Sequence, residues 1–323
     1  MGREESLTYD RRRRALLKGL SLIPLVGCLP QEASPNPVPD SSPHPDLQLR
    51  RKIPSTGEPI PCLGLGTYRA FSRLDSEETT SALREVLTLF SKWGGRVIDT
   101  SPMYANAESV LGTLLPQAPS PESGWFLATK VWTNGQSAGE SQMKSSSERI
   151  GASPLDLVQI HNLRDWKTHL PTLRRLKGEG KIRYIGLTTW GGHDHARMLE
   201  AMKSKDIDFI QVSYNIFNRK IEDQILPVAQ ELGLAVLANR PFEQGRLFSK
   251  VEGRDIPEWA RSELKISSWA QFFLKFLLAD ERVTAVIPAT SKPRHLVDNM
   301  RAGLGPLPDA ELRTRMVSYL EQI

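Results

Sequence analysis

RVIDTSPMY (residues 96–104) joins a short apolar run, typical of a buried parallel strand, to the polar residues Asp99 and Tyr104. Two later runs have the same form: GWFLATKV carries Lys130 near its end, and LDLVQIHN carries His161. In a chain that alternates strands and helices, the carboxyl ends of the parallel strands meet on one face of the protein. The sequence therefore predicts that these four side chains converge on one pocket.

Similar apolar runs recur through the chain, at about 30 residues for each strand and the helix after it. The predicted strands are CLGLGTY (62–68), RVIDT (96–100), WFLATKV (125–131), DLVQIH (156–161), RYIGLTT (183–189), FIQVSYN (209–215), AVLANRP (235–241) and VTAVIPAT (283–290). Amphipathic periodicity predicts helices over 75–95, 105–115, 166–180, 221–233, 266–279 and 309–323. The first of these helices has Asp75 as its expected N-cap, with Glu78 three residues on. This order of elements predicts an α/β protein, a (β/α)₈ TIM barrel.

Composition limits the other classes of protein. Residues 50–323, roughly 275 residues, suit one barrel better than two domains. The net charge of the whole chain is +5, but residues 1–18 hold six cations and three anions and so account for +3 of it. The remaining residues have a net charge of only +2, so we expect no nucleic-acid partner. Cysteine and histidine spacings typical of zinc sites are absent from the sequence, and GGHDH (191–195) fits a helix start better than a metal site. We expect no metal.

The N-terminus has the pattern of a targeting signal. Arg13-Arg14, in RRALLK, resembles a twin-arginine export signal, and a short apolar segment ends in Leu25-Val26-Gly27-Cys28, which resembles a lipoprotein processing box. We interpret residues 1–28 as this signal, with lipidation at Cys28, and residues 29–49 as a disordered linker rich in Pro and Ser. The expected location is periplasmic, on a membrane through the lipid anchor, the outer one in a two-membrane bacterium. The alternative is a basic amphipathic surface helix.

The predicted pocket has the groups needed to deliver a proton. A tyrosine has an ordinary pKa of about 10, and the nearby ammonium of Lys130 favours its phenolate. Asp99 keeps Lys130 charged, because an unpaired buried ammonium is costly. His161 adds a hydrogen-bonding group. Tyr104 is therefore a candidate general acid for a developing alkoxide.

A second candidate site follows the last strand. IPATSKPRH (287–295) leads into a helix whose exposed N–H groups, hydroxyls and cations favour an anion, and Pro293 suits the first helical turn. The groups concerned are Thr290, Ser291, Lys292 and Arg294. A plain capped surface helix is the alternative.

Five strings in order resemble the aldo-keto reductase family over residues 50–303: IPSTGEPIPCLGLGTYR (53–69), the Asp/Tyr, Lys and His strings, and IPATSKPRHLVDN (287–299). The resemblance implies an N-terminal β-hairpin, Asp99, Tyr104, Lys130 and His161 as catalytic residues, and NADP(H) as cofactor. It places the 2′-phosphate of NADPH on the turn at 290–294 and the adenine near Asp298 and Asn299. The implied contacts elsewhere are Gly66, Thr67, Tyr68, Thr188, Thr189, Gln211, Arg240 and Phe242.

Two departures from the family pattern affect the cofactor site. Thr188-Thr189 replaces the usual Ser-Asn pair that holds the nicotinamide amide. Asn239-Arg240 stands where many members have Tyr-Ser, so the ring that stacks on the nicotinamide is missing, and Arg240 is expected to reach the pyrophosphate instead.

The resemblance predicts an NADPH-dependent reductase of aldehydes or ketones. Gly64-Leu65-Gly66 lacks the Rossmann glycine pattern. The alternative is an exported nucleotide-binding barrel that acts as a sensor or partner subunit without significant turnover.

Overall fold

The computed structural model describes residues 45–191, 194–204 and 206–323. The predicted export signal, Cys28 and most of the predicted linker lie outside these residues. The end of that linker lies within them, where Gln48 is buried and its amide donates to the Met300 carbonyl at 3.0 Å. The Leu49 N–H also donates to the Gly303 carbonyl, at 3.2 Å. The folded part of the chain therefore begins before residue 50.

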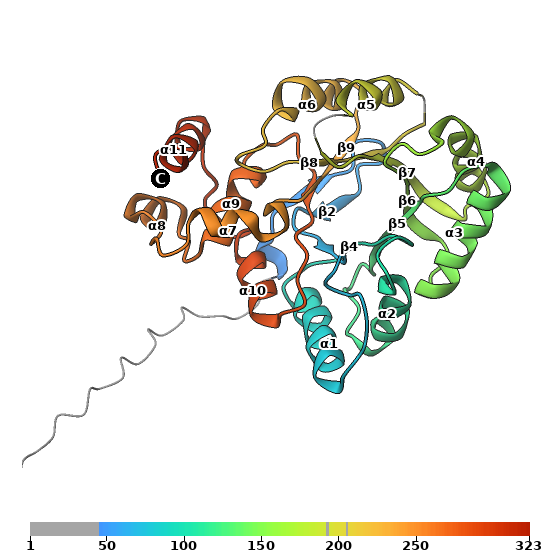
Figure 1. Cartoon of the computed structure of the whole chain (residues 1–323), viewed down its shortest axis with the longest axis horizontal. Helices are drawn as coiled ribbons and strands as arrows, with labels where there is room; N and C mark the ends of the chain where they lie inside the picture. The colour runs from blue at the N-terminus through green and yellow to red at the C-terminus, as the bar shows by residue number, and fades with distance from the viewer. Residues whose placement is uncertain (1–44, 192–193, 205) are drawn as a thin grey trace, which may run out of the picture. The chain divides into compact units, whose positions relative to one another are not determined.

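Eight parallel strands form a barrel (Figure 1). They are β3 (Leu65–Gly66), β4 (Val97–Asp99), β5 (Phe126–Val131), β6 (Leu155–His161), β7 (Ile182–Thr188), β8 (Phe209–Ser213), β9 (Ala235–Asn239) and β10 (Ala285–Val286). Each strand pairs with the next in sequence, and the bridges Leu63–Val286 and Gly66–Ala289 join the first to the last. An antiparallel hairpin, β1 (Arg50–Lys52) and β2 (Pro59–Pro61), precedes them. The predicted barrel, its strands and the hairpin are confirmed.

Helices surround the barrel (Figure 1). They are α1 (Glu77–Lys92), α2 (Ala107–Leu114), α3 (Gln136–Ile150), α4 (Trp166–Gly178), α5 (His195–Met202), α6 (Ile221–Glu231), α7 (Arg246–Lys250), α8 (Glu258–Leu264), α9 (Trp269–Leu278), α10 (Pro293–Arg301) and α11 (Ala310–Glu321). Within the described residues, no helix combines the length and the apolar character needed to cross a bilayer.

Some helix predictions need correction. The N-cap of α1 is Ser76 and not Asp75, because the Ser76 hydroxyl accepts the Thr79 N–H at 3.0 Å while Asp75 pairs with Arg73. Helices α3, α7 and α8 were not predicted from the sequence. Helix α3 has the sequence QSAGESQMKSSSERI, in which too few apolar residues recur to give a helical signal.

Two apolar layers hold the barrel together. The outer layer lies between the strands and the helices. The inner layer fills the amino end of the barrel, where Phe126 stacks on Tyr184 with ring centroids 5.8 Å apart and contacts Phe209 at 6.0 Å. Ile53 and Ile60 of the hairpin belong to the same cluster and are fully buried. The hairpin thus closes this end, which leaves the carboxyl end for a site.

Glu58, in the hairpin turn, ties the hairpin to the barrel. Its carboxylate accepts hydrogen bonds from Arg96 Nη1 at 3.0 Å, from the Tyr184 hydroxyl at 2.6 Å and from Arg183. Burial acts to raise the pKa of Glu58, but the Tyr184 hydrogen bond and the charge and hydrogen bonds of the two arginines outweigh it, so the pKa lies below its usual 4.5. The ionised form is therefore the form that stabilises the hairpin.

We predict that Glu58→Gln lowers the free energy of unfolding at pH 7 by about 1.5–3 kcal/mol, the range expected for hydrogen bonds to a charged group. Because the folded-state pKa is depressed, the contribution of Glu58 is fully present above pH 4.5 and is lost as the pH falls through the folded value. The difference in the free energy of unfolding between the wild type and Glu58→Gln should therefore shrink as the pH falls below 4.5. Urea unfolding at several pH values measures it.

Glu148→Gln is the matched control, because Glu148 is exposed on α3 and, among the described residues, pairs only with Lys144, at 3.8 Å. Its effect should stay within about 0.5 kcal/mol at every pH. A Glu58→Gln protein as stable as this control at pH 7 would contradict the assigned role of the hairpin turn.

Candidate active site

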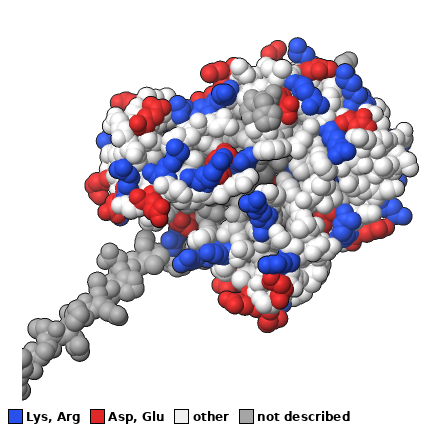
Figure 2. All heavy atoms as spheres, viewed as in Figure 1, with Lys and Arg blue, Asp and Glu red and all other residues white. Residues whose placement is uncertain are grey.

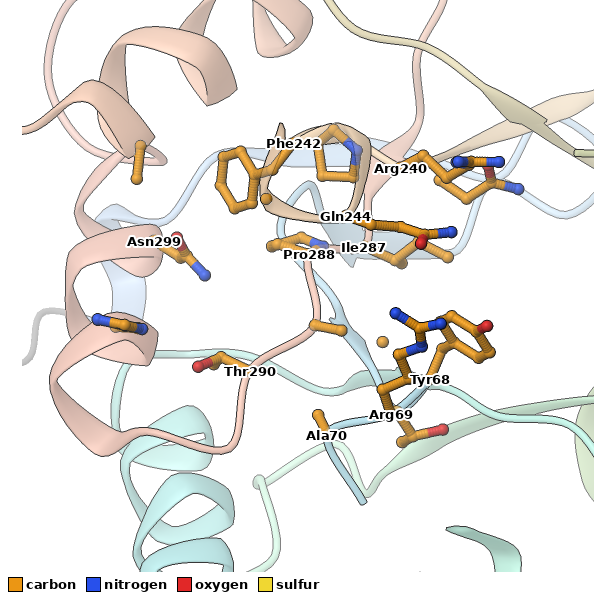
Figure 3. A pocket seen from close by; sticks show the side chains of 18 of the residues that line it. Tyr68, Arg69, Ala70, Arg240, Phe242, Gln244, Ile287, Pro288, Thr290 and Asn299 are labelled. Atoms are coloured by element: carbon orange, nitrogen blue, oxygen red, sulfur yellow. The ribbon is translucent and has the colours of Figure 1, made fainter. Parts of the chain in front are cut away.

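The carboxyl end of the barrel opens into a cavity of about 1160 Å³. The ends of β3, β4 and β6 to β9 line it, together with the turn before α10. Figure 3 shows Tyr68 and Arg240 toward one end of the view and Asn299, on α10, toward the other. Asp99, Tyr104 and His161 line the same cavity, as predicted, while Lys130, the fourth predicted residue, lies fully buried against Asp99 and is not among the lining residues.

Asp99 is the centre of a buried polar layer. One carboxylate oxygen accepts Lys130 Nζ at 2.6 Å. The other accepts two amide groups, Gln159 Nε2 at 2.9 Å and Gln211 Nε2 at 2.8 Å. All four side chains are at most 3% exposed. A carboxylate with three donors is held in one position, and it compensates the ammonium beside it.

Gln159 is a member of this layer that the sequence reading missed. A Cβ on Gly186, in the adjacent strand β7, would lie 2.7 Å from Gln159 Cγ, so the glycine makes room for the glutamine. Gln159 Oε1 is buried and has no hydrogen-bond partner in the part of the chain that the structure describes. The reverse orientation of the amide would place this oxygen against the Asp99 carboxylate, so the observed orientation is the favourable one.

Lys130 is fully buried and charged. Besides Asp99, it donates to the Thr100 carbonyl at 2.7 Å. Burial acts to lower its pKa, but the carboxylate of Asp99 and the hydroxyl of Tyr104 together raise that pKa above its usual 10.5. The ammonium therefore remains protonated across the physiological range.

Tyr104 lies beside this ammonium, with Lys130 Nζ 4.9 Å from the ring centroid. The expectation that Lys130 lowers the pKa of Tyr104 is only partly correct. Burial raises the pKa of Tyr104 above 10, and the charge of Lys130 acts against that effect without cancelling it. Tyr104 is therefore a protonated phenol at neutral pH, and Lys130 favours the phenolate that remains after a proton leaves.

His161 lies against Tyr104, with ring centroids 5.9 Å apart and nearly perpendicular. Burial, followed by the charge of Lys130, lowers the pKa of His161 to about 3. The imidazole is thus neutral at pH 7. Its Nδ1 lies 3.2 Å from the hydroxyl of Ser101.

Gln211 connects this layer to an amide-rich corner of the cavity. Its Oε1 accepts from the Thr188 hydroxyl at 3.3 Å and from Asn239 Nδ2 at 3.4 Å, while its Nε2 donates to Asp99. Asn239 also accepts from the Ser213 hydroxyl at 2.8 Å. Asn239 thus takes the position at the end of β9 as part of a hydrogen-bonded network and not as a stacking ring.

Arg240 lines the cavity and has two partners beside it. Its guanidinium pairs with Glu243 at 2.7 Å and lies 5.3 Å from the ring centroid of Trp190. Its φ of 55° lies in the left-handed region, as do those of Glu243 and Gln244, at 48° and 58°. These contacts hold the Arg240 side chain at the Trp190 side of the cavity.

The turn before α10 forms as predicted. Pro293 is the first residue of the helix and Lys292 the residue before it. The Thr290 hydroxyl accepts the Lys292 N–H at 3.1 Å, and Asp298 accepts Gln271 Nε2 from α9 at 2.6 Å. Thr290, Ser291, Lys292, Asp298 and Asn299 line the cavity, as do Gly66, Thr67, Tyr68, Thr188, Gln211, Arg240 and Phe242. Thr189 and Arg294 are not among the lining residues.

Several cavity residues carried no sequence signal. The ring centroids of Trp132 and His161 lie 6.4 Å apart. The guanidinium of Arg164 lies 4.3 Å from the ring centroid of Trp132. Arg254 and Arg261 reach the cavity from the region of α8. Figure 2 shows basic side chains beside the hollow at the centre of this face. The cavity is suited to an anionic ligand.

Comparison with known proteins gives one family. The model of the aldo/keto reductase family matches residues 62–315. The NADH-specific methylglyoxal reductase of Escherichia coli is 29% identical over 201 residues, which are 52% of this chain and 59% of that protein. The match thus spans little more than half the length of that relative.

Solved structures extend the likeness over most of the chain. An aldo/keto reductase from Klebsiella pneumoniae in complex with NADP and acetate is 26% identical, with a TM-score of 0.67, and the match covers 82% of this chain and 93% of that one. A thermostable aldo-keto reductase in complex with the inhibitor epalrestat is also 26% identical, with a TM-score of 0.69 and coverages of 84% and 99%.

Proposed function

The chain belongs to the aldo/keto reductase family, and from this premise we propose that it reduces aldehydes or ketones to alcohols with NADPH, with Tyr104 as general acid. The observation that carries the proposal is the buried Lys130–Asp99 pair beside a protonated Tyr104 in the wall of the cavity. A protein that only bound a nucleotide would not need this pair, because burying two charges costs free energy. Turnover therefore fits the site better than a sensor role.

The residues present fit a dinucleotide. The cavity volume of about 1160 Å³ leaves room for one, and Arg254, Arg261 and Lys292 offer charge to its phosphates. Thr188, Gln211 and Asn239 offer donors and acceptors to a carboxamide. NADPH, when bound, supplies the hydride. The Klebsiella relative, solved with NADP, supports this choice of cofactor.

The mechanism assigns one task to each side chain. His161, uncharged, orients the substrate carbonyl by a hydrogen bond near Tyr104. Tyr104 donates its hydroxyl proton to the carbonyl oxygen as that oxygen gains negative charge. Lys130 stabilises the phenolate that results, and Asp99 holds Lys130 in place with the help of Gln159 and Gln211.

We predict that Tyr104→Phe lowers kcat for aldehyde reduction by about 10²–10⁴-fold, the usual contribution of a general acid, because the ring remains and only the proton is lost. NADPH binding, followed by fluorescence titration, should be unchanged. The rate is measured from the absorbance of NADPH over a panel of aldehydes and ketones.

Tyr319→Phe is the matched control, because Tyr319 lies on α11 outside the lining of the cavity and should keep the wild-type rate. A Tyr104→Phe protein with full activity would remove Tyr104 from its role. A wild-type protein that binds NADPH but reduces no member of the panel would favour the sensor alternative.

A further prediction concerns the choice of cofactor. Lys292 lines the cavity at the start of α10, so we expect NADPH to bind more tightly than NADH and the ratio to shrink as salt rises. Lys292→Ala should weaken NADPH binding by about tenfold, the loss of one charge-assisted contact, and leave NADH nearly unchanged. Arg294→Ala, whose side chain does not line the cavity, is the control. Equal affinities of the wild type for both cofactors would reject the assignment.

We also propose that the protein is exported by the twin-arginine route and lipidated at Cys28, which would tether it to a membrane facing the periplasm. The support is the sequence Arg13-Arg14 and the box Leu25-Val26-Gly27-Cys28. We predict that Arg13→Lys with Arg14→Lys traps the precursor in the cytoplasm and that Cys28→Ala prevents labelling with a lipid precursor. Fractionation that finds the native, full-length chain in the cytoplasm would overturn this proposal and leave the reductase proposal intact.

A further inference from the structure

Ser101 occupies an unusual position beside the catalytic residues. It follows β4 by two residues and is fully buried. Its oxygen accepts the backbone N–H of Met103 at 3.2 Å and lies 3.2 Å from Nδ1 of His161. No other hydrogen bond of the Ser101 side chain is present among the described residues, so its contacts reduce to these two.

We infer that Ser101 fixes the tautomer of His161, leaving Nδ1 without a proton and presenting Nε2–H to the cavity. A hydroxyl has one proton to donate and two lone pairs. The Met103 N–H uses one lone pair, and the hydroxyl proton must then find an acceptor. Within the described residues, Nδ1 of His161 is the acceptor within reach.

The opposite arrangement is unfavourable. If Nδ1 carried the proton and donated it to Ser101, the hydroxyl oxygen would accept two hydrogen bonds, and its own proton would be buried without a partner. Leaving a buried donor unsatisfied costs about 1–3 kcal/mol. The competing form with protons on both ring nitrogens is excluded at neutral pH, because burial and the charge of Lys130 hold the pKa of His161 at about 3.

This tautomer decides which ring nitrogen of His161 can donate a hydrogen bond to a ligand. His161 lines the cavity, and its Nε2 makes no hydrogen bond with the described residues, so this nitrogen is available to a ligand. An N–H there can donate to a carbonyl oxygen, whereas a bare nitrogen would repel it. Ser101 is thus a positioning residue that acts through His161, and this role rests on the proposed carbonyl reduction.

The tautomer can be observed without turnover. We would label the histidines with ¹⁵N and record long-range ¹H–¹⁵N spectra at neutral pH, in which the bare ring nitrogen resonates far from the protonated one. His161→Gln assigns the signals of His161. His169 is an internal standard, because its Nε2 lies 2.9 Å from the Thr133 carbonyl, an acceptor, and must carry the proton.

The wild type should show a bare Nδ1 on His161, in the same pattern as His169. In Ser101→Ala the pattern of His161 should shift toward a protonated Nδ1, while that of His169 stays unchanged. Ser101→Thr, which keeps a hydroxyl, should restore the wild-type pattern. Ser146→Ala, which removes another fully buried hydroxyl on α3, should leave both patterns as they are.

Activity gives a second readout. Ser101→Ala should lower kcat/KM for an aldehyde by about tenfold, the ratio that corresponds to one hydrogen bond, and Ser101→Thr should recover most of it. A protonated Nδ1 in the wild type, or a Ser101→Ala spectrum identical to it, would overturn the inference. A wild type without carbonyl reduction would reject the proposed function alone, because the spectra are recorded on the free protein.

Discussion

The site depends on placing a charged pair inside a barrel. Lys130 and Asp99 are both taken out of water, and removing either partner from such a pair typically costs about 3–5 kcal/mol, because the other charge is left uncompensated. The pair belongs to a polar layer with groups from five strands: Asp99 on β4, Lys130 on β5, Gln159 on β6, Thr188 on β7 and Gln211 on β8. The strands can contribute these groups at one level because neighbouring parallel strands are in fixed register, with Asp99 opposite Ala128 and Lys130 opposite Gln159. The catalytic geometry is therefore a property of the barrel as a whole.

The two ends of the barrel use charge in different ways. At the amino end, Glu58 accepts hydrogen bonds from Arg96 and Arg183 near the surface, and these bonds attach the hairpin that closes the barrel. At the carboxyl end, the charges lie beneath an open cavity, and the outermost groups, Tyr104 and His161, are both uncharged at neutral pH. Stability and chemistry are thus separated by the aromatic layer around Phe126, Tyr184 and Phe209.

Much of this arrangement could be predicted from the sequence. Each strand is a short apolar run, so the residue at which it ends could be located in the sequence. Asp99, Lys130 and His161 are polar residues at or near such ends. Gln159 was missed although it alternates inward with Leu157 and His161, because an amide in a strand has no spacing rule of its own. The role of Ser101 also depends on its contact with His161, which is 60 residues away in the sequence.

Other features could not be predicted for physical reasons. The helix start at Ser76 was misplaced by one residue, because Asp and Ser are both good N-caps and the competing partner Arg73 decides between them. The direction of the Tyr104 pKa shift required the burial of the ring, which outweighs the neighbouring cation. The pairing of Arg240 with Glu243 was not visible in the sequence, because it depends on three left-handed residues in one loop.

The closure of the barrel has a consequence for how the chain acquires its structure. Leu63 and Gly66 pair with Val286 and Ala289, so the first strand finds its second neighbour only when nearly the whole chain is available. Contacts this distant in sequence slow folding, because the entropy of closing the loop is lost before the contact forms. During synthesis, β3 therefore stays as an unpaired edge while the intervening strands assemble, and such edges are prone to pair with other chains. The ring gains its last hydrogen bonds, and loses this exposed edge, when residues 285–289 have left the ribosome.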